Sequence, residues 1–421
     1  MLYSHFSMVR KAYIILADGH VFEGKAFGAL GCVTGEMVFT TGMVGYLETL
    51  TDPSYYGQII VQTFPLIGNY GVIPSDFESA GPHLQGYVVR EYCDFPSNFR
   101  SQGTLDDFLK SNNVVGVYDV DTRAITKLIR EAGVMNARIL TFSGDSQTDQ
   151  KVQEELEKAL NEHTKDSYLK ELASLDIPAA IPKVTGSAES ISQSSEEVFK
   201  QSALYKAVPV TPEGQKVMDL EAAARKGKGK KVLLWDFGAK ANIRRELQKR
   251  GLDVVTIKAQ TTAEEIFAMK PDGIMLSNGP GDPSQNPDII AQIKTVSDSG
   301  IPLFGICMGH QLLALARGAK TYKLKYGHRG GNQPVKELAT GRVYISSQNH
   351  GYAVDNDTLP AGAQLCFVNA NDGTCEGIIY TDIPAFSVQF HPEAASGPLD
   401  TNFLFDNFVE LIQKNPSDKR K

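Results

Sequence analysis

The hydrophobic pattern of the first third of the chain consists of short apolar or alternating runs that predict strands. Residues 12–17 and 20–23 flank Asp18-Gly19, and an Asp-Gly pair between two such runs favours a β-hairpin. Further strands are expected at residues 36–40, 58–63, 85–91, 114–118 and 137–141. Helices are expected after Thr104 and Asp121, which can cap a first turn. Residues 11–142 are therefore predicted to form a mixed α+β domain.

Residues 230–414 alternate between buried-strand patterns and helical spacing. Strands are expected at 232–237, 253–258, 273–278 and 301–306, and helices at 240–250, 263–269 and 288–299. Repeated β-α-β units pair their strands in parallel and cover both faces of the sheet with helices. This domain is therefore predicted to be a doubly wound, mostly parallel α/β sheet, which binds ligands at the carboxyl ends of its strands.

Residues 143–229 differ from both flanks because Ser, Gln, Glu and Lys replace the β-branched runs. The helical spacing of Val152, Leu156 and Leu160 predicts that part of this region packs as a helix. We expect the region to connect the two domains.

The pattern changes sharply at Cys307. The apolar run 301–306 ends there, and helical spacing begins behind it. Gly305 and Gly309 lie two residues to either side, which is the G-x-nucleophile-x-G spacing of a nucleophile elbow with sulfur in place of the hydroxyl. A helix N-terminus favours the thiolate form, and the N–H of Met308 is placed to face a developing oxyanion. A buried structural cysteine is the alternative, which the flanking glycines disfavour.

Two other stretches, residues 279–281 and 391–393, have residue types that would assist a nucleophilic thiolate. Gly279 and Gly281 follow the predicted strand at 273–278, where they leave room for a ligand and offer further N–H donors, although a plain turn is the alternative. After a predicted strand at 386–390, His391 and Glu393 share a face if the chain stays extended. His391 is then expected to move a proton while Glu393 orients its ring.

Composition restricts the classes of function. A formal net charge of -7 argues against nucleic acid or an anionic membrane as the main partner. No apolar run reaches the roughly 18 residues of a membrane span. Five cysteines without C-x-x-C spacing indicate neither a disulfide framework nor a zinc site, so we expect no metal and a reducing compartment. The cytoplasm is expected, and the short basic start makes the mitochondrial matrix the alternative.

Four separated motifs together resemble the class I glutamine amidotransferases. They are residues 276–283, 305–311, 347–352 and 389–393. Members of that family hydrolyse the side-chain amide of glutamine through a γ-glutamyl thioester and deliver the ammonia to a synthetase. The resemblance implies that Cys307 is the nucleophile, His391 the base and Glu393 its orienting partner.

The first domain and one stretch of the second resemble the small-chain family of carbamoyl phosphate synthetases, most closely its eukaryotic arginine-specific form. The likeness is carried by residues 34–41, 45–46, 51–55, 65–71 and 326–335. It implies glutamine contacts at Ser54, Gly279, Gly281, Met308, Gln311, Asn349, Gly351 and Tyr352. Met308 and Tyr352 stand where bacterial relatives more often have leucine and phenylalanine.

The resemblance also implies a partner. No ATP-binding domain is recognisable, so ATP and its metal ions are expected on a large synthetase subunit, and this chain is expected to need no cofactor. The first domain is the expected docking surface, and arginine synthesis the expected use of the product, with pyrimidine synthesis as the alternative. Two other functions stay open: a docking module without catalysis, which the reactive residues disfavour, and a stand-alone hydrolase of γ-glutamyl bonds, which the small-chain domain disfavours.

Overall fold

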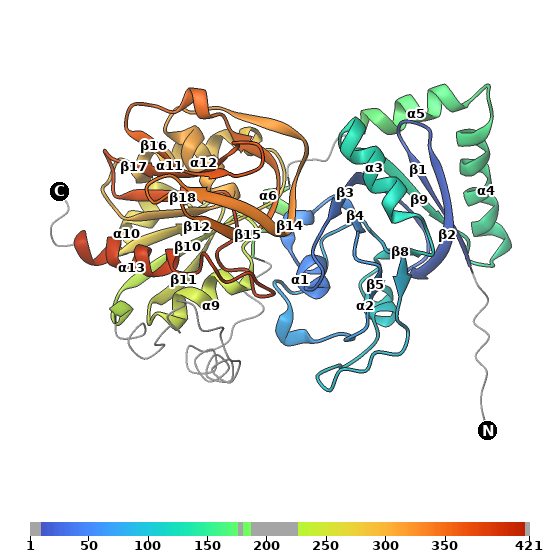
Figure 1. Cartoon of the computed structure of the whole chain (residues 1–421), viewed down its shortest axis with the longest axis horizontal. Coiled ribbons are helices and arrows are strands. Elements are labelled where there is room, and N and C mark those ends of the chain that lie inside the picture. The colour runs from blue at the N-terminus through green and yellow to red at the C-terminus, as the bar shows by residue number, and fades with distance from the viewer. Residues whose placement is uncertain (1–9, 176–179, 187–225, 417–421) are drawn as a thin grey trace. The chain divides into compact units, whose positions relative to one another are not determined.

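The computed structural model describes residues 10–175, 180–186 and 226–416 (Figure 1). The chain divides into two compact units. The N-terminal unit takes most of the first 178 residues, and the C-terminal unit takes the remainder together with two short segments, Asp52–Ser54 and Glu78–Ala80. The first of these segments reaches the candidate active site through Asp52 and Ser54, and the second binds the start of α9 (Ala241–Lys249) through Glu78.

The N-terminal unit is built on a closed barrel with the strand order β1-β2-β8-β6-β4-β3-β9. These strands are β1 (Lys11–Leu16), β2 (Val21–Gly28), β3 (Cys32–Thr40), β4 (Gln58–Gln62), β6 (Gly86–Val88), β8 (Val115–Tyr118) and β9 (Met135–Thr141). The predicted hairpin is confirmed, since β1 pairs with β2 in antiparallel register. The single strand expected at 85–91 is wrong, because the chain leaves the barrel after β6 and forms β7 (Glu91–Tyr92), which pairs with β5 (Leu66–Ile67) in a separate sheet.

The helices of this unit are α1 (Tyr46–Leu50), α2 (Leu105–Ser111), α3 (Thr122–Ala132), α4 (Ser146–Leu160) and α5 (Lys165–Ser174). Both expected caps are present: Thr104 accepts a hydrogen bond from the backbone of Asp107, and Asp121 from that of Ala124. In α4, Val152 and Leu156 pack against the barrel as predicted, whereas Leu160 is 55% exposed at the helix end. Residues 187–225 of the expected connecting segment lie outside the described residues.

The C-terminal unit contains a nine-stranded sheet with the order β11-β10-β12-β13-β18-β17-β16-β14-β15. The strands are β10 (Lys231–Asp236), β11 (Asp253–Lys258), β12 (Gly273–Leu276), β13 (Leu303–Ile306), β14 (Thr321–Glu337), β15 (Val343–Val354), β16 (Ala363–Asn369), β17 (Cys375–Tyr380) and β18 (Ala385–Val388). The first five strands in this order are parallel, as predicted. The other four extend the sheet in antiparallel fashion.

Helices cover both faces of this sheet (Figure 1). They are α6 (Ile181–Val184), α9 (Ala241–Lys249), α10 (Ala263–Ala268), α11 (Pro287–Ser297), α12 (Met308–Ala316) and α13 (Leu404–Lys414). Along β10, Leu233 and Trp235 pack on the side of α10, α11 and α12, whereas Val232 and Leu234 pack on the side of α9 and α13. The doubly wound prediction is thereby confirmed.

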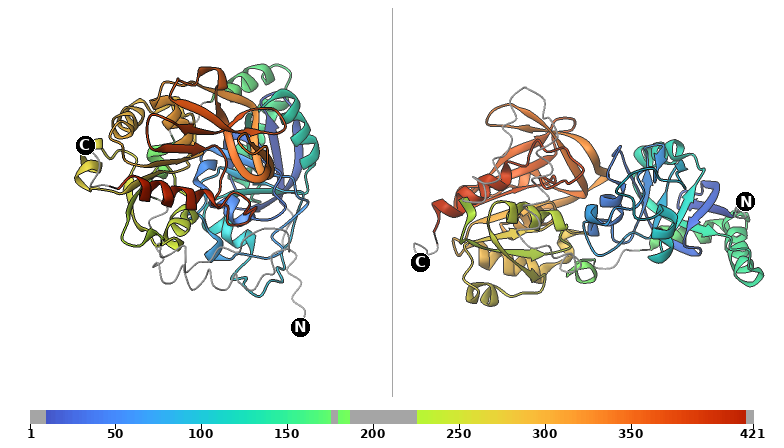
Figure 2. Two further views of the ribbon diagram at one scale, coloured as in Figure 1. Left: turned by 60° about the vertical axis from the view of Figure 1, so that its left-hand side comes forward. Right: turned by 90° about the horizontal axis from the view of Figure 1, so that it is seen from below.

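The long β14–β15 ribbon can be followed from two further sides in Figure 2, where it is drawn in orange. Among the described residues, no helix combines the length and the apolar character needed to cross a bilayer. All five cysteines are free.

Candidate active site

Cys307 lies at the corner between β13 and α12. Its backbone has φ 52° and ψ -102°, a conformation that non-glycine residues rarely adopt. The hydrogen bond from its N–H to the carbonyl oxygen of Val388 (2.9 Å) ties the corner to the neighbouring strand β18. Backbone strain of this kind is concentrated at functional sites, and here it places the sulfur at the start of a helix.

The glycines on either side of Cys307 are required by close backbone contacts. A Cβ atom at Gly309 would lie 2.3 Å from the carbonyl oxygen of Leu276, and one at Gly305 would lie 2.8 Å from the carbonyl oxygen of Gly309. Any side chain at these positions would push α12 away from β12 and β13. The spacing read from the sequence is therefore a packing requirement of the elbow.

His391 and Glu393 follow β18 and form a buried pair. Nδ1 of His391 lies 2.6 Å from Oε1 of Glu393, and both side chains are fully buried. The extended geometry expected for this stretch is wrong, because β18 ends at Val388 and Glu393 reaches His391 across a turn. With Nδ1 bound to the carboxylate, Nε2 of His391 is the ring nitrogen left for proton transfer, and the side chain of Cys307 is the group that interacts with the ring.

Two further charged residues of the site, Lys240 and Asp52, were not predicted from the sequence. Lys240 precedes α9, and its Nζ lies 3.2 Å from Oδ2 of Asp52, 3.5 Å from Nδ1 of His391 and 3.9 Å from Oε1 of Glu393. Asp52 accepts a further hydrogen bond from Nδ2 of Asn349 (3.0 Å). One buried cation thus joins two carboxylates.

The charges around His391 oppose one another. Burial and the positive charge of Lys240 lower its pKa, whereas Glu393 and Cys307 raise it, and together they bring the pKa of His391 to about 9. The imidazole is therefore protonated at neutral pH and is suited to stabilise a sulfur anion. Burial alone would lower the pKa of Lys240, but Asp52 and Glu393 raise it above its usual value, so the lysine stays charged.

Several predicted glutamine contacts meet around Cys307. Its Sγ lies 3.6 Å from the carbonyl oxygen of Asn349 on β15. Gln311, one turn along α12, donates through Nε2 to the carbonyl oxygen of Tyr352 at 2.7 Å. Met308 is the first residue of α12, and Gly351 lies on β15 between Asn349 and Tyr352.

The remaining predicted contacts lie on two loops. Oγ of Ser54 accepts a hydrogen bond from Nδ2 of Asn278 at 2.9 Å, which brings Ser54 to the carboxyl end of β12. Gly279 follows directly, and a Cβ atom there would meet the carbonyl oxygen of Phe237 at 2.4 Å. Gly281 has φ +89°. The roles of all eight residues in binding glutamine stay predictions.

Lys240 and Asp52 were missed because nothing in their local pattern marks them. Position offers one signal, since Lys240 comes four residues after β10, at the same end of the sheet as Cys307 and Asn278. Asp52 lies beside Ser54, whose backbone N–H donates to Oδ1 of Asp52 (2.9 Å). The backbone of this short segment is thus fixed by its own aspartate.

Comparison with protein families assigns both halves of the chain. The model of the glutamine amidotransferase class-I family matches residues 233–411. The model of the carbamoyl-phosphate synthase small chain, CPSase domain, matches residues 14–139.

Individual relatives match over nearly the full length. The carbamoyl phosphate synthase small chain of Syntrophotalea carbinolica is 45% identical over 408 residues, which cover 96% of this chain and 98% of that one. The corresponding protein of Listeria monocytogenes serotype 4b is 45% identical over 403 residues, with 96% and 97% covered. The pyrimidine-specific small chain of Bacillus subtilis is 44% identical over 403 residues, with 96% of each chain covered.

Proposed function

The chain belongs to the small-chain family of carbamoyl phosphate synthases, and from this premise we propose that it hydrolyses glutamine through a thioester on Cys307 and passes the ammonia to a large synthetase chain. One observation carries the proposal. His391 is held by Glu393 through Nδ1, and its ring interacts with the side chain of Cys307 at the strained elbow.

In the proposed reaction, the Cys307 thiolate attacks the side-chain carbonyl carbon of glutamine. A C–S bond forms, and the carbonyl electrons move to an oxyanion that the N–H of Met308 and the Gly279–Gly281 loop are placed to receive. The C–N bond then breaks, and protonated His391 supplies the proton with which ammonia leaves. Water, deprotonated by His391, cleaves the thioester, so that one glutamine and one water give glutamate and ammonia.

The substrate contacts of this proposal come from four parts of the C-terminal unit. Ser54 and the loop after β12 would bind on one side, α12 would contribute Met308 and Gln311, and β15 would contribute Asn349, Gly351 and Tyr352. The two hydrogen bonds already made between α12 and β15 and between Ser54 and Asn278 support a preformed pocket.

We assign ATP and its metal ions to the large chain, and the docking surface to the N-terminal unit. A permanent pair of chains of this kind is expected to bury upwards of about 2,000 Å². The five free cysteines support a reducing compartment, and we propose the cytoplasm.

We also propose that the carbamoyl phosphate serves arginine synthesis, on the resemblance to the eukaryotic arginine-specific form. The pyrimidine-specific relative is 44% identical, so identity does not decide between the pathways. A strain that lacks this chain should require arginine. A requirement for uracil alone would contradict the assignment.

Replacement of Cys307 tests the proposed chemistry. In the complex with the large chain, Cys307→Ala should abolish glutamine-dependent synthesis of carbamoyl phosphate and leave synthesis from free ammonia intact. Loss of both activities would make the cysteine structural. A chain that hydrolyses glutamine fully without any ATP-using partner would instead be a stand-alone hydrolase, and one that binds the partner without glutamine turnover would be a docking module.

A further inference from the structure

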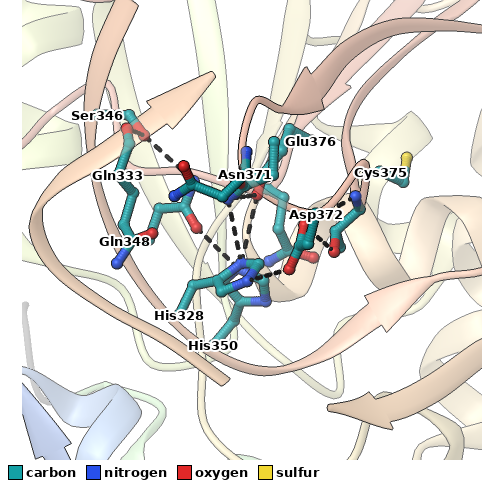
Figure 3. A network of polar contacts seen from close by, with 12 residues as sticks. His328, Gln333, Ser346, Gln348, His350, Asn371, Asp372, Cys375 and Glu376 are labelled. Atoms are coloured by element: carbon teal, nitrogen blue, oxygen red, sulfur yellow. Dashed lines mark hydrogen bonds and ion pairs between the residues drawn. The ribbon is translucent and has the colours of Figure 1, made fainter. Parts of the chain in front are cut away.

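A polar network, buried except at Asp372, joins four strands of the C-terminal sheet beside the candidate active site (Figure 3). His328 on β14 lies between two carboxylates, with Nε2 at 2.9 Å from Oδ2 of Asp372 and Nδ1 at 3.5 Å from Oε1 of Glu376 on β17. Asn369 on β16 donates to the same oxygen of Glu376 at 3.1 Å. Glu376 is fully buried, and its Oε2 has no hydrogen-bond partner among the described residues.

The network touches β15 through a pair of histidines. His328 and His350 are opposite each other in the β14–β15 register, and their rings meet edge to face with centroids 5.0 Å apart. Nδ1 of His350 donates to the carbonyl oxygen of Tyr352 at 2.7 Å, and its Nε2 lies 3.1 Å from Oε1 of Gln348. The Tyr352 carbonyl is the one that also accepts the hydrogen bond from Gln311.

The backbone ladder is interrupted on both sides of this part of β15. Three pairs, from His328–His350 to Gly330–Gln348, lie between two register irregularities, and regular pairing resumes at Lys323–Tyr352 on one side and at Gln333–Ser346 on the other. Short ladders between bulges leave the register to side chains. Asn349 pairs with Arg329 within this stretch, and Tyr352 pairs with Lys323 beyond the irregularity, so the contact between His328 and His350 lies where the ladder between these two residues is interrupted.

The residue types alone suggest a divalent cation at His328, His350 and Glu376, whose nearest ligand atoms all lie within 4.8 Å of one another. Asn369 opposes that interpretation. Its amide nitrogen lies 3.5 Å from Nδ1 of His328 and 3.1 Å from Glu376, and its oxygen already accepts from the backbone of Asn371. N–H groups directed into a site repel a cation.

Protonated His328 itself supplies a positive charge next to the carboxylates of Glu376 and Asp372. Burial alone would lower its pKa, but the hydrogen bonds and charges of Glu376 and Asp372 raise the pKa of His328 above its ordinary value. Burial and the nearby His328 hold the pKa of His350 well below its ordinary value. Burial raises the pKa of Glu376, and the hydrogen bond and charge of His328 oppose that rise. The contacts of His328 with both carboxylates favour the charged histidine there, and neutral His350 donates to the Tyr352 carbonyl.

We propose that the His328–Glu376 ion pair is a positioning pair for glutamine, which acts through His350 to hold Asn349 and the Tyr352 carbonyl in their binding geometry. This inference rests on the proposed function, because it takes Asn349, Gly351 and Tyr352 as glutamine contacts. Cys307, His391 and Glu393 are held by β13, α12 and the turn after β18. Glu376 meets this turn through its backbone carbonyl, which accepts from the N–H of Gln389 at 2.9 Å, so a substitution of the Glu376 side chain keeps that contact. Loss of the pair should therefore weaken glutamine binding and leave the chemical step intact.

Matched substitutions at His328 separate its two contacts. In His328→Asn the side-chain amide lies where Nδ1 was, so the contact with Glu376 is kept. In His328→Gln the amide reaches the position of Nε2, so only the contact with Asp372 is kept. In the complex with the large chain, we expect His328→Gln and Glu376→Gln to raise the KM for glutamine about tenfold with kcat within about threefold. His328→Asn should leave KM within about threefold of the parent.

Two controls separate positioning from stability and from the proposed function. Glu246→Gln breaks an equally buried pair with Arg250, and it should lower Tm without changing KM. The inference would be overturned if KM were unchanged in His328→Gln and Glu376→Gln. It would also be overturned if kcat fell as much as KM rose, or if the two His328 variants had equal effects. Glutamine turnover by Cys307→Ala would overturn the proposed function instead.

Discussion

Nζ of Lys240 lies 3.2 Å from Oδ2 of Asp52, although 187 positions of the sequence separate the two residues. The ion pair is buried and continues to the catalytic candidates, because Lys240 also approaches His391 and Asp52 also binds Asn349. The lysine therefore does two things in this site. It neutralises the carboxylates of Asp52 and Glu393, and it opposes the proton on His391.

Removing the lysine charge should move the pH dependence of the enzyme toward alkaline pH. Lys240 lowers the pKa of His391, so Lys240→Met raises that pKa. The activity that requires protonated His391 is then retained to higher pH. The measurement is the alkaline limb of kcat/KM for glutamine hydrolysis. A limb that stays in place, or moves toward acid, would show that Lys240 does not act on His391.

The opposite shift is expected for Glu393. Its carboxylate raises the pKa of His391, so Glu393→Gln should move the alkaline limb to lower pH. It should also lower kcat by about 10²-fold, the scale of a positioned acid–base group, because the imidazole loses its charged partner. Ammonia-dependent synthesis in the same complex is the control. A variant with parental kcat and pH profile would remove Glu393 from the mechanism.

The elbow predicts that Gly309 tolerates no side chain. Gly309→Ala brings Cβ against the carbonyl oxygen of Leu276, and overpacking of this kind costs about 2 kcal/mol in the free energy of unfolding. The rate of glutamine hydrolysis should also fall in this variant, because α12 carries Met308 and Gln311. Denaturant unfolding measures the loss of stability. Gly103→Ala is the matched control, because a Cβ atom there meets nothing within 4 Å; equal effects of both variants would contradict the packing argument.

The Arg250–Glu246 pair predicts an acid-sensitive stability. Nη1 of Arg250 lies 2.9 Å from Oε2 of Glu246, and both residues are buried. Burial would raise the pKa of Glu246, but Lys249 and Arg250 hold it below its ordinary value of 4.5. Its stabilisation is therefore fully present above pH 4.5 and is lost as the pH falls through the lower, folded-state value.

Thermal unfolding between pH 7 and pH 3 checks this expectation. The loss of Tm on acidification should be smaller in Glu246→Gln than in the parent, because the variant has already lost the pair at neutral pH. Parallel Tm curves for the two proteins would show that Glu246 does not contribute to the acid sensitivity.

The elements that follow from local pattern could be predicted from the sequence. The parallel strands follow from short contiguous apolar runs, and their helices from apolar residues at helical spacing. The Cys307 corner follows from the change between these two patterns, with Gly305 and Gly309 on either side. The long strands β14 and β15 were not predicted. They are only partly buried, so apolar and polar positions do not alternate regularly along them.

Contacts between distant segments could not be predicted from pattern. The contact between Lys240 and Asp52 depends on the fold of the sheet and on the position of the loop Asp52–Ser54 beside it. His391 and Glu393 were expected to meet, but along an extended chain rather than across a turn. The residue types alone suggested that His391 and Glu393 form a pair. The turn that brings the two side chains together could not be predicted from the sequence.

In the proposed reaction the sulfur of Cys307 carries the glutamyl group during turnover. Acid quenching of the complex during glutamine hydrolysis, followed by mass spectrometry of its peptides, tests whether this thioester forms. We predict a γ-glutamyl adduct on the peptide that contains Cys307, absent from Cys307→Ala and lost when the glutamine is exhausted. Steady glutamine hydrolysis by a Cys307→Ala variant, or a glutamyl adduct on another cysteine, would contradict the account.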